Sequence, residues 1–267
     1  MEFTTDIFKL NPPTSKTYNL IGTVLPNNID YFYRAKQKEL LDQYQGARIF
    51  LSETETTDWT HYFQMNNNDT DEIFKLILKG YLYETALYYY NVIIDLSWSL
   101  CYSSLEFACT QNGKRVSTSV MSPIDKAYDL LRSVEKNVMG PTAPENPFSY
   151  LKKLNYEYSN VIDYIIDFWE KFMDSDVRKK YNYCKHRGKP LYTELSAYDN
   201  TRFFGFYVQN KDGDTTQLVS DISDVQYKMS LNDSIEELRR FDDEMLYPYI
   251  EGLFPQIEKL INLSPMV

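Results

Sequence analysis

The chain is 267 residues long and has little glycine, cysteine or histidine, with 9 Gly, 3 Cys and 2 His. All-β sandwiches and barrels need a turn about every 8–12 residues, so the scarcity of glycine argues against these folds. The cysteines Cys101, Cys109 and Cys184 are odd in number and show no CxxC spacing. They predict buried free thiols in a reducing compartment, rather than a disulfide framework or a zinc site.

Long apolar runs are also missing. The most apolar stretch, residues 86–101, is interrupted by Asn91, Asp95 and two serines. It falls short of the roughly 20 apolar residues that a membrane-spanning helix needs. The first residues, MEFTTDIFKL, lack the apolar segment of a signal peptide. We therefore expect a cytoplasmic protein with no membrane partner.

Nucleotide-cofactor and serine-hydrolase motifs are absent as well, since the sequence holds no GxGxxG, P-loop or GxSxG pattern. We accordingly expect no cofactor and no bound metal. Acidic residues outnumber basic ones, 38 to 28, which gives a net charge of -10. This negative net charge argues against a protein that binds phosphate groups over its whole surface, but it is compatible with a local basic patch.

An aromatic content of 16% argues against a disordered chain. Residues 1–68 combine an arm rich in Thr, Asn and Pro, a weak helical pattern over 29–45 closed by Gly46, and a polar loop over 52–70. Residues 73–110 carry apolar side chains on nearly every helical face, which is typical of a helix buried in a bundle. Acidic residues precede this segment, where they favour a helix start.

Further helical patterns cover 122–139, 148–187 as one or two helices, and 232–261 with a kink at Pro248. Gly188 and Pro190 end the second of these, and residues 232–234 cap the third. Residues 202–219 predict a β-hairpin with a turn at 211–213, followed by a short strand near 225–229. The prediction is a mainly α bundle of long antiparallel helices with a small hairpin inserted near 201–220. We expect an N-terminal arm at 1–68 and a bundle at 69–267, together forming one domain.

A basic island interrupts the acidic chain near the end of the second of these helical patterns. Residues 178–189 hold no acidic residue and six Lys or Arg: Arg178, Lys179, Lys180, Lys185, Arg187 and Lys189. Arg178, Asn182 and His186 lie at i, i+4 and i+8, with Lys185 in the same arc, so we expect them to share a face. Such a set could bind a phosphodiester and move a proton. The alternative is that cations near a helix C-terminus only complement the macrodipole and the last carbonyls.

The stretch Tyr181 to His186 (YNYCKH), at the end of a long predicted helix, resembles the signature of HEPN-domain proteins. That family is a helical bundle whose motif is an Arg, then a polar residue, then a His a few positions further on. Many members are metal-independent endoribonucleases that dimerise so that two motifs face each other. The resemblance implies a homodimer that acts on RNA and belongs to a toxin–antitoxin or phage-defence system.

Asn182 matches the polar position of the family motif and His186 matches its His, whereas Tyr181 stands where the family has Arg. Arg178, one turn earlier, is the candidate replacement. The resemblance then implies that His186 is the general acid and base and that Asn182 positions the reacting groups. Arg178, Lys185 and Arg187 would hold the phosphate.

Glu84, Asp95 and Glu106 are spaced by 11 residues, which places them in one line along a helix. With Tyr181 they are candidate supporting residues, because a carboxylate could orient His186 or pair with Arg178. A solvated stripe is the simpler alternative. His61 lies in a polar loop, so we expect it to be a surface residue. We expect the many tyrosines to pack in the core rather than to stack on nucleic-acid bases.

Two functions remain open from the sequence. The first is an RNA-cleaving HEPN-like enzyme built on His186. The second is a non-catalytic helical protein with a degenerate motif, which would serve dimerisation or bind an acidic protein segment or, at most, a nucleotide.

Overall fold

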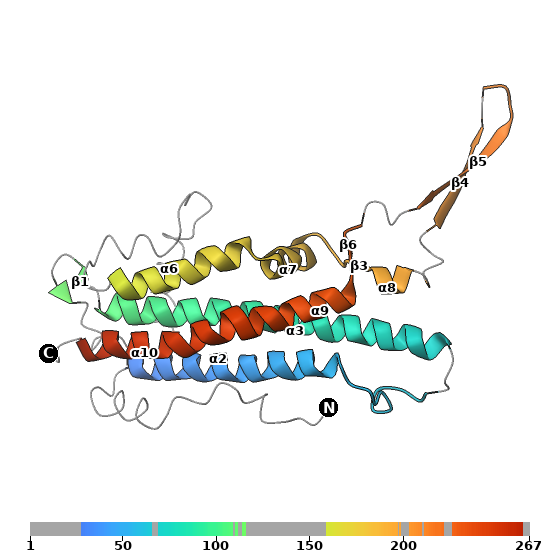
Figure 1. Ribbon diagram of the computed structural model, residues 1–267. Coiled ribbons are helices and arrows are strands. Elements are labelled where there is room, and N and C mark those ends of the chain that lie inside the picture. The colour runs from blue at the N-terminus through green and yellow to red at the C-terminus, as the bar shows by residue number, and fades with distance from the viewer. Residues whose placement is uncertain are drawn as a thin grey trace.

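Long helices lying side by side make up most of the chain (Figure 1). The computed structural model describes residues 28–65, 69–108, 110–111, 114–115, 159–196, 198, 203–209, 211–221 and 226–263. The helices of the bundle are α2 (Asn28–Glu53), α3 (Asp69–Ala108), α6 (Ser159–Asp174), α7 (Asp176–His186), α9 (Leu231–Phe241), the π-helix η6 (Asp242–Leu246) and α10 (Tyr247–Leu263). The predicted mainly α bundle of long helices is confirmed. The predicted helix over 122–139 lies outside the described residues.

Helix α3 is the central helix of the bundle. It runs for 40 residues and has Asp69, Asp71 and Glu72 in its first turn, where the positive end of the macrodipole favours carboxylates. Helices α2, α7, α9 and α10 all pack against it, which explains the apolar residues on nearly every face. Phe74, Tyr81 and Tyr88 are exceptions, since all three are exposed.

Helix α2 is longer than predicted. The sequence predicted an end at Gly46, but the helix continues to Glu53. A Cβ atom at Gly46 would lie 3.0 Å from ring atom Cε1 of Tyr89 on α3. The glycine therefore allows a close approach of two helices, and it does not end one. The polar loop that follows is correspondingly shorter than the predicted 52–70.

The second helical segment is a pair of helices, as the sequence allowed. Ser175 separates α6 from α7, and its hydroxyl accepts a hydrogen bond from the backbone N–H of Arg178 at 3.2 Å. At the other end of α7 the carbonyl of Tyr183 accepts hydrogen bonds from Arg187 N and Gly188 N. Gly188 has a φ of 125°, which a glycine adopts without strain. The predicted helix end is confirmed.

In the described ranges the helices are accompanied by three two-stranded sheets: β1 (Thr110–Gln111) with β2 (Lys114–Arg115), β3 (Leu191–Tyr192) with β6 (Lys228–Met229), and β4 (Phe203–Gln209) with β5 (Thr215–Asp221). The last pair is the predicted hairpin, with Gly213 at a φ of 87° in its turn. The strand predicted near 225–229 is β6, but it pairs in parallel with β3 and does not join the hairpin. The short helix α8 (Thr193–Ser196) follows β3.

The final helix differs from the prediction in its start and in its irregularity. It begins at Leu231 with Ser230 as its cap, and this cap lies two positions before the first of the predicted capping residues 232–234. The π-helix η6 interrupts it, and Pro248 lies in the first turn of α10. A proline clashes with the carbonyl four residues earlier, here that of Glu244, so the wider turn lies just before the proline. The predicted kink at Pro248 is therefore a π turn upstream of it.

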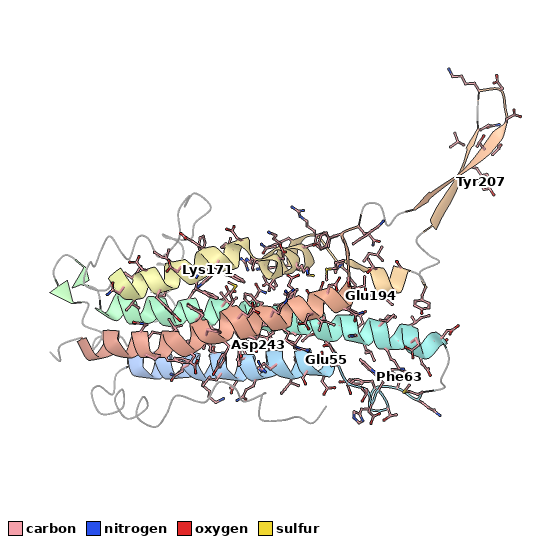
Figure 2. All side chains as sticks on the ribbon, in the orientation of Figure 1. Glu55, Phe63, Lys171, Glu194, Tyr207 and Asp243 are labelled. Atoms are coloured by element: carbon pink, nitrogen blue, oxygen red, sulfur yellow. The ribbon has the colours of Figure 1, made fainter. Side chains whose placement is uncertain are left out.

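A carboxylate from α8 caps helix α9 (Figure 2). Glu194 accepts hydrogen bonds from Leu231 N at 2.9 Å, Asn232 N at 3.0 Å and the Ser230 hydroxyl at 3.0 Å. Burial alone would raise the pKa of Glu194, but these backbone N–H donors outweigh burial and lower it below the ordinary value of 4.5. This contact fixes the segment after α7 to the start of α9.

Glu194→Gln is expected to lower the free energy of unfolding at neutral pH by about 1 kcal/mol, because the helix start loses a charged acceptor. A lowered pKa stabilises the fold above the unfolded-state value of 4.5, and this stabilisation is lost as pH falls through the lower folded-state pKa. Urea unfolding at neutral and acidic pH checks this: the difference between wild type and variant should shrink in acid. Glu244→Gln, at an exposed site, is the control. An equal loss of unfolding free energy in both variants would show that Glu194 does not stabilise the start of α9 as a cap.

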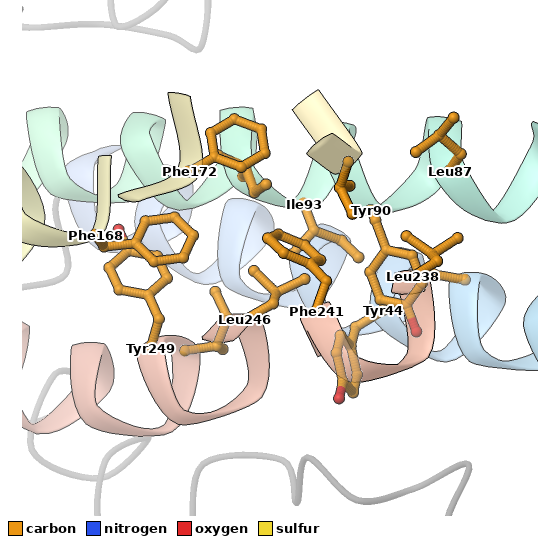
Figure 3. Close-up of a cluster of buried hydrophobic side chains, with 14 of the residues drawn as sticks. Tyr44, Leu87, Tyr90, Ile93, Phe168, Phe172, Leu238, Phe241, Leu246 and Tyr249 are labelled. Atoms are coloured by element: carbon orange, nitrogen blue, oxygen red, sulfur yellow. The ribbon is translucent and has the colours of Figure 1, made fainter. Parts of the chain in front are cut away.

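The core lies between α2, α3, α6 and the C-terminal helices (Figure 3). Phe168 of α6 stacks on Tyr249 of α10 with ring centres 3.6 Å apart and planes 4° apart. Phe172, one turn further along α6, lies 5.9 Å from Phe241 of α9 and 6.2 Å from Trp98 of α3. These rings are buried, so they hold α6 and the start of α7 against the bundle.

Candidate functional site at the end of helix α7

Helix α7 has one buried face and one charged face. Val177, Lys180 and Tyr181 are buried. The ammonium of Lys180 donates to Oε2 of Glu237 on α9 at 2.6 Å, so the buried charge is paired. Of the remaining cations of the basic island, Arg178 is half-buried, and the exposed ones are Lys179, Lys185, Arg187 and Lys189. His186 is exposed with them.

Arg178 is directed into the bundle. Its Nη1 donates to Oδ1 of Asn91 on α3 at 3.3 Å, and the amide nitrogen of Asn91 donates to the carbonyl of Leu87 at 2.8 Å. The guanidinium lies 5.3 Å from the ring centre of Phe172 and 5.4 Å from that of Tyr181. Such contacts over aromatic faces suit a planar cation. Arg178 therefore connects α7 to α3.

The structure does not bring Arg178 to His186. Within the residues the structure describes, no hydrogen bond joins Arg178, Asn182 and His186 to one another. Eight residues on an α-helix leave two side chains about 80° apart around the axis. Because Arg178 faces α3 and His186 faces solvent, the expected common face is divided into an inner and an outer part. Asn182 is half-buried between them.

Tyr181, at the position of the family's Arg, is part of the packing of α7. Its ring is buried, and two cations approach it: the guanidinium of Arg178 lies 5.4 Å from the ring centre and Nζ of Lys185 lies 5.6 Å from it. The ring therefore contacts both the inner and the outer cation of α7. Lys185 belongs to the exposed group.

Lys185, His186 and Arg187 form the exposed basic end of α7. In the described part of the chain none of their side chains donates a hydrogen bond to a protein group. The carbonyl of Tyr183 is satisfied by two backbone donors, so these cations are not needed to bind it. They still complement the negative end of the macrodipole. Their hydrogen-bonding atoms remain available to a ligand, and phosphate is the group that such donors bind best.

Glu84, one of the carboxylates expected to support the site, binds other residues. Glu84 accepts a hydrogen bond from the hydroxyl of Tyr192 at 2.7 Å and lies 3.9 Å from Nζ of Lys189. Lys189 also sits over the ring of Tyr81 at 3.9 Å. Glu84 thus fixes the segment after α7, while Asp95 is exposed. Within the described residues, the partners of Glu84 are Tyr192 and Lys189, and neither His186 nor Arg178 is among them. Residue 106 lies in a part of α3 whose side chains are not described.

A buried polar cluster that the sequence did not reveal lies between α2, α3 and η6. The carboxylate of Asp242 accepts hydrogen bonds from Tyr44 at 2.7 Å, Tyr90 at 3.0 Å and Arg48 at 2.5 Å. Asp242 is 1% exposed. Burial raises its pKa although Arg48 and the hydroxyls oppose this, and burial also raises the pKa of Tyr44 and Tyr90.

The partners in this cluster are up to 198 residues apart in the chain, and no local pattern could have paired them. Asp242 begins the acidic run 242–244, which in the sequence is typical of an exposed helix face. Since the cluster is enclosed by the bundle, we assign it to the stability of the fold rather than to the site on α7.

Among the described residues there is no group of three His, Cys, Asp or Glu that could hold a metal ion. No helix in the described ranges is long and apolar enough to cross a membrane. In comparisons with known proteins, no family model, no curated protein and no solved structure matches this chain.

Proposed function

We propose that this chain is a HEPN-like protein that binds and cleaves RNA at the exposed basic end of α7. The observation that carries the proposal is that Lys185, His186 and Arg187 are exposed together, and that their side chains form no hydrogen bond with any residue that the structure describes. The helix beneath them is held by the buried residues Lys180 and Tyr181. Cations that project from a helix held in place by packing can bind the phosphates of an anionic polymer such as RNA.

In this proposal Lys185 and Arg187 bind the phosphate and His186 transfers the proton. The imidazole takes the proton from a 2′-hydroxyl, whose oxygen then attacks the adjacent phosphorus. The bond from phosphorus to the 5′-oxygen breaks, and the proton is delivered to that oxygen. The products are a 2′,3′-cyclic phosphate and a 5′-hydroxyl, and the step needs no metal ion.

Arg178 receives a different role from the one that the sequence predicted. Because its guanidinium binds Asn91 inside the bundle, we assign it to positioning α7 and not to binding the phosphate. The family resemblance further implies that two chains bring two His186 side chains together. It also implies a cytoplasmic role in a toxin–antitoxin or phage-defence system, and the absence of CxxC spacing in the sequence agrees with a reducing compartment.

His186→Ala is expected to lower the rate of RNA cleavage by about 10²–10⁴-fold, the usual contribution of a general acid or base. Cleavage of a labelled RNA in the presence of EDTA measures this, and identification of the cyclic phosphate product checks the chemistry. Lys179→Ala removes an exposed cation from the same helix and serves as the matched control. Equal rates in wild type and His186→Ala would refute the catalytic role.

The second candidate function is a non-catalytic interaction protein. Two observations favour it: Tyr181 is buried at the position of the family's Arg, and Arg178 is turned away from the exposed end of α7. In that case Lys185 and Arg187 would bind an acidic partner segment or a nucleotide. Wild-type protein that binds RNA or an acidic peptide through these residues, but leaves RNA intact, would select this function over the first.

A further inference from the structure

The hairpin β4–β5 extends away from the bundle (Figure 1), and the main contacts of each strand are with the other strand. Tyr207 is 71% exposed and Val208 is 38% exposed. Figure 2 shows Tyr207 on the hairpin at a distance from the helices. Because consecutive residues of a strand face opposite sides, exposure of both means that both faces of the hairpin are open at this point.

Among the described residues β4 pairs with β5 alone, so its other edge has no partner strand in that part of the chain. Its sequence, Phe203 to Gln209 (FFGFYVQ), contains no charged residue and no proline. Exposed edge strands are normally kept from pairing by lysines, prolines or bulges. An isolated two-stranded hairpin is moreover only marginally stable in water. Both facts indicate that β4 pairs with a further strand.

We propose that this further strand is β4 of a second copy of the chain, paired antiparallel across a two-fold axis at Phe206. The result is a four-stranded sheet in the order β5–β4–β4–β5. The register follows from the centre of the strand: Phe206 lies opposite Phe206, Phe204 opposite Val208, and Gly205 opposite Tyr207. An isologous pair of this kind closes on itself.

The residue types at these positions favour self-pairing. Aromatic residues pair well across strands with each other, as Phe206 would with Phe206 of the second copy. They also pair well with β-branched residues, as Phe204 would with Val208. An aromatic residue opposite a glycine covers the exposed backbone, which fits Tyr207 opposite Gly205. No charge opposes a like charge anywhere along the pair. Within each hairpin the neighbouring position of Phe206 is Leu218, so the apolar row continues across all four strands.

Phe206→Lys is expected to raise the dissociation constant of the dimer at least about tenfold, because two ammonium groups would lie directly opposite each other. Sedimentation velocity of the full chain over a concentration series measures this, with the wild type reaching twice the chain mass of 31.6 kDa. Gln217→Lys places the same charge on β5, opposite Tyr207 in the hairpin, and should leave the dimer unchanged.

A charge-pair variant tests the register itself. Phe204→Glu and Val208→Lys should each weaken the dimer when introduced singly. Combined in one chain they should restore it, since the introduced carboxylate of one copy faces the introduced ammonium of the other, twice in each dimer. A register shifted by two residues would not give this recovery.

Amide exchange separates loss of pairing from loss of the hairpin. In the wild type and in Gln217→Lys, exchange over residues 203–209 should slow as concentration rises, and in Phe206→Lys it should not. The proposal is overturned by a single-chain mass at every concentration, by a dimer that resists Phe206→Lys, or by fibres in place of a closed dimer. These measurements use no RNA, so RNA cleavage by His186 keeps its own test. A single-chain mass at every concentration would also remove the homodimer of the proposed function, whereas a dimer that resists Phe206→Lys would overturn the β4 pairing alone.

Discussion

Asp242→Ala is expected to lower the free energy of unfolding by about 3–5 kcal/mol, the usual cost of removing one partner from a buried ion pair. The side chain of Arg48 is 16% exposed, so its guanidinium would remain buried beside an empty space. The hydroxyls of Tyr44 and Tyr90 would lose their acceptor as well. Urea or guanidinium unfolding followed by circular dichroism measures the loss.

The neighbouring residue provides the control. Asp243 also approaches Arg48, at 3.9 Å, but its side chain is 48% exposed. Asp243→Ala should therefore cost less than about 1 kcal/mol. Asp242→Asn, which keeps an acceptor and nearly the same shape, should fall between the two. Similar losses of unfolding free energy for Asp242→Ala and Asp243→Ala would show that burial of the carboxylate does not set its contribution to stability.

Phe172→Ala is expected to lower the free energy of unfolding by about 3–5 kcal/mol, because it removes a fully buried ring and leaves a cavity. The ring contacts aromatic residues of three elements, and it also lies against the guanidinium of Arg178. Met173→Ala, at the next residue and 37% exposed, should cost far less. Denaturant unfolding of both variants provides the comparison.

The same variant tests the support of the basic end of α7. If Phe172 and Arg178 hold this helix in place, Phe172→Ala should weaken RNA binding even where the protein remains folded. Unchanged RNA affinity in a folded but destabilised variant would show that the position of α7 depends on its other contacts, such as Lys180 with Glu237.

Features set by local chemistry were predictable from the sequence. The end of α7 follows from Gly188 and Pro190, and the turn of the hairpin follows from Gly213. Gly46 shows where local rules fail. A glycine after a weak helical pattern predicts a helix end, yet here it makes room for Tyr89 on another helix. The information lies in the neighbouring helix and not in the residues around the glycine.

In the candidate site, too, some features follow from local sequence and others depend on distant residues. Exposure of Lys185, His186 and Arg187 follows from their place in the last turn of a helix that buries Tyr181. The inward direction of Arg178 depends on an acceptor, Asn91, that lies 87 residues earlier in the chain. Helical spacing alone predicted that Arg178 and His186 share one face of the helix. Spacing does not show which neighbouring helix offers a hydrogen-bond acceptor, so it could not predict that Arg178 turns inward.

The π turn η6 has a consequence for how the C-terminal helices can change length. Buried apolar residues recur at intervals of three or four positions along α9 up to Phe241, and again from Leu246 along α10. The step from Phe241 to Leu246 spans five positions, so the turn acts as an extra residue that resets the angular phase of the apolar stripe. Deleting one residue there would rotate all of α10 by about 100° relative to α9. Tyr249 and Leu253 would then leave the core, so the number of residues in this turn is as constrained as their identity.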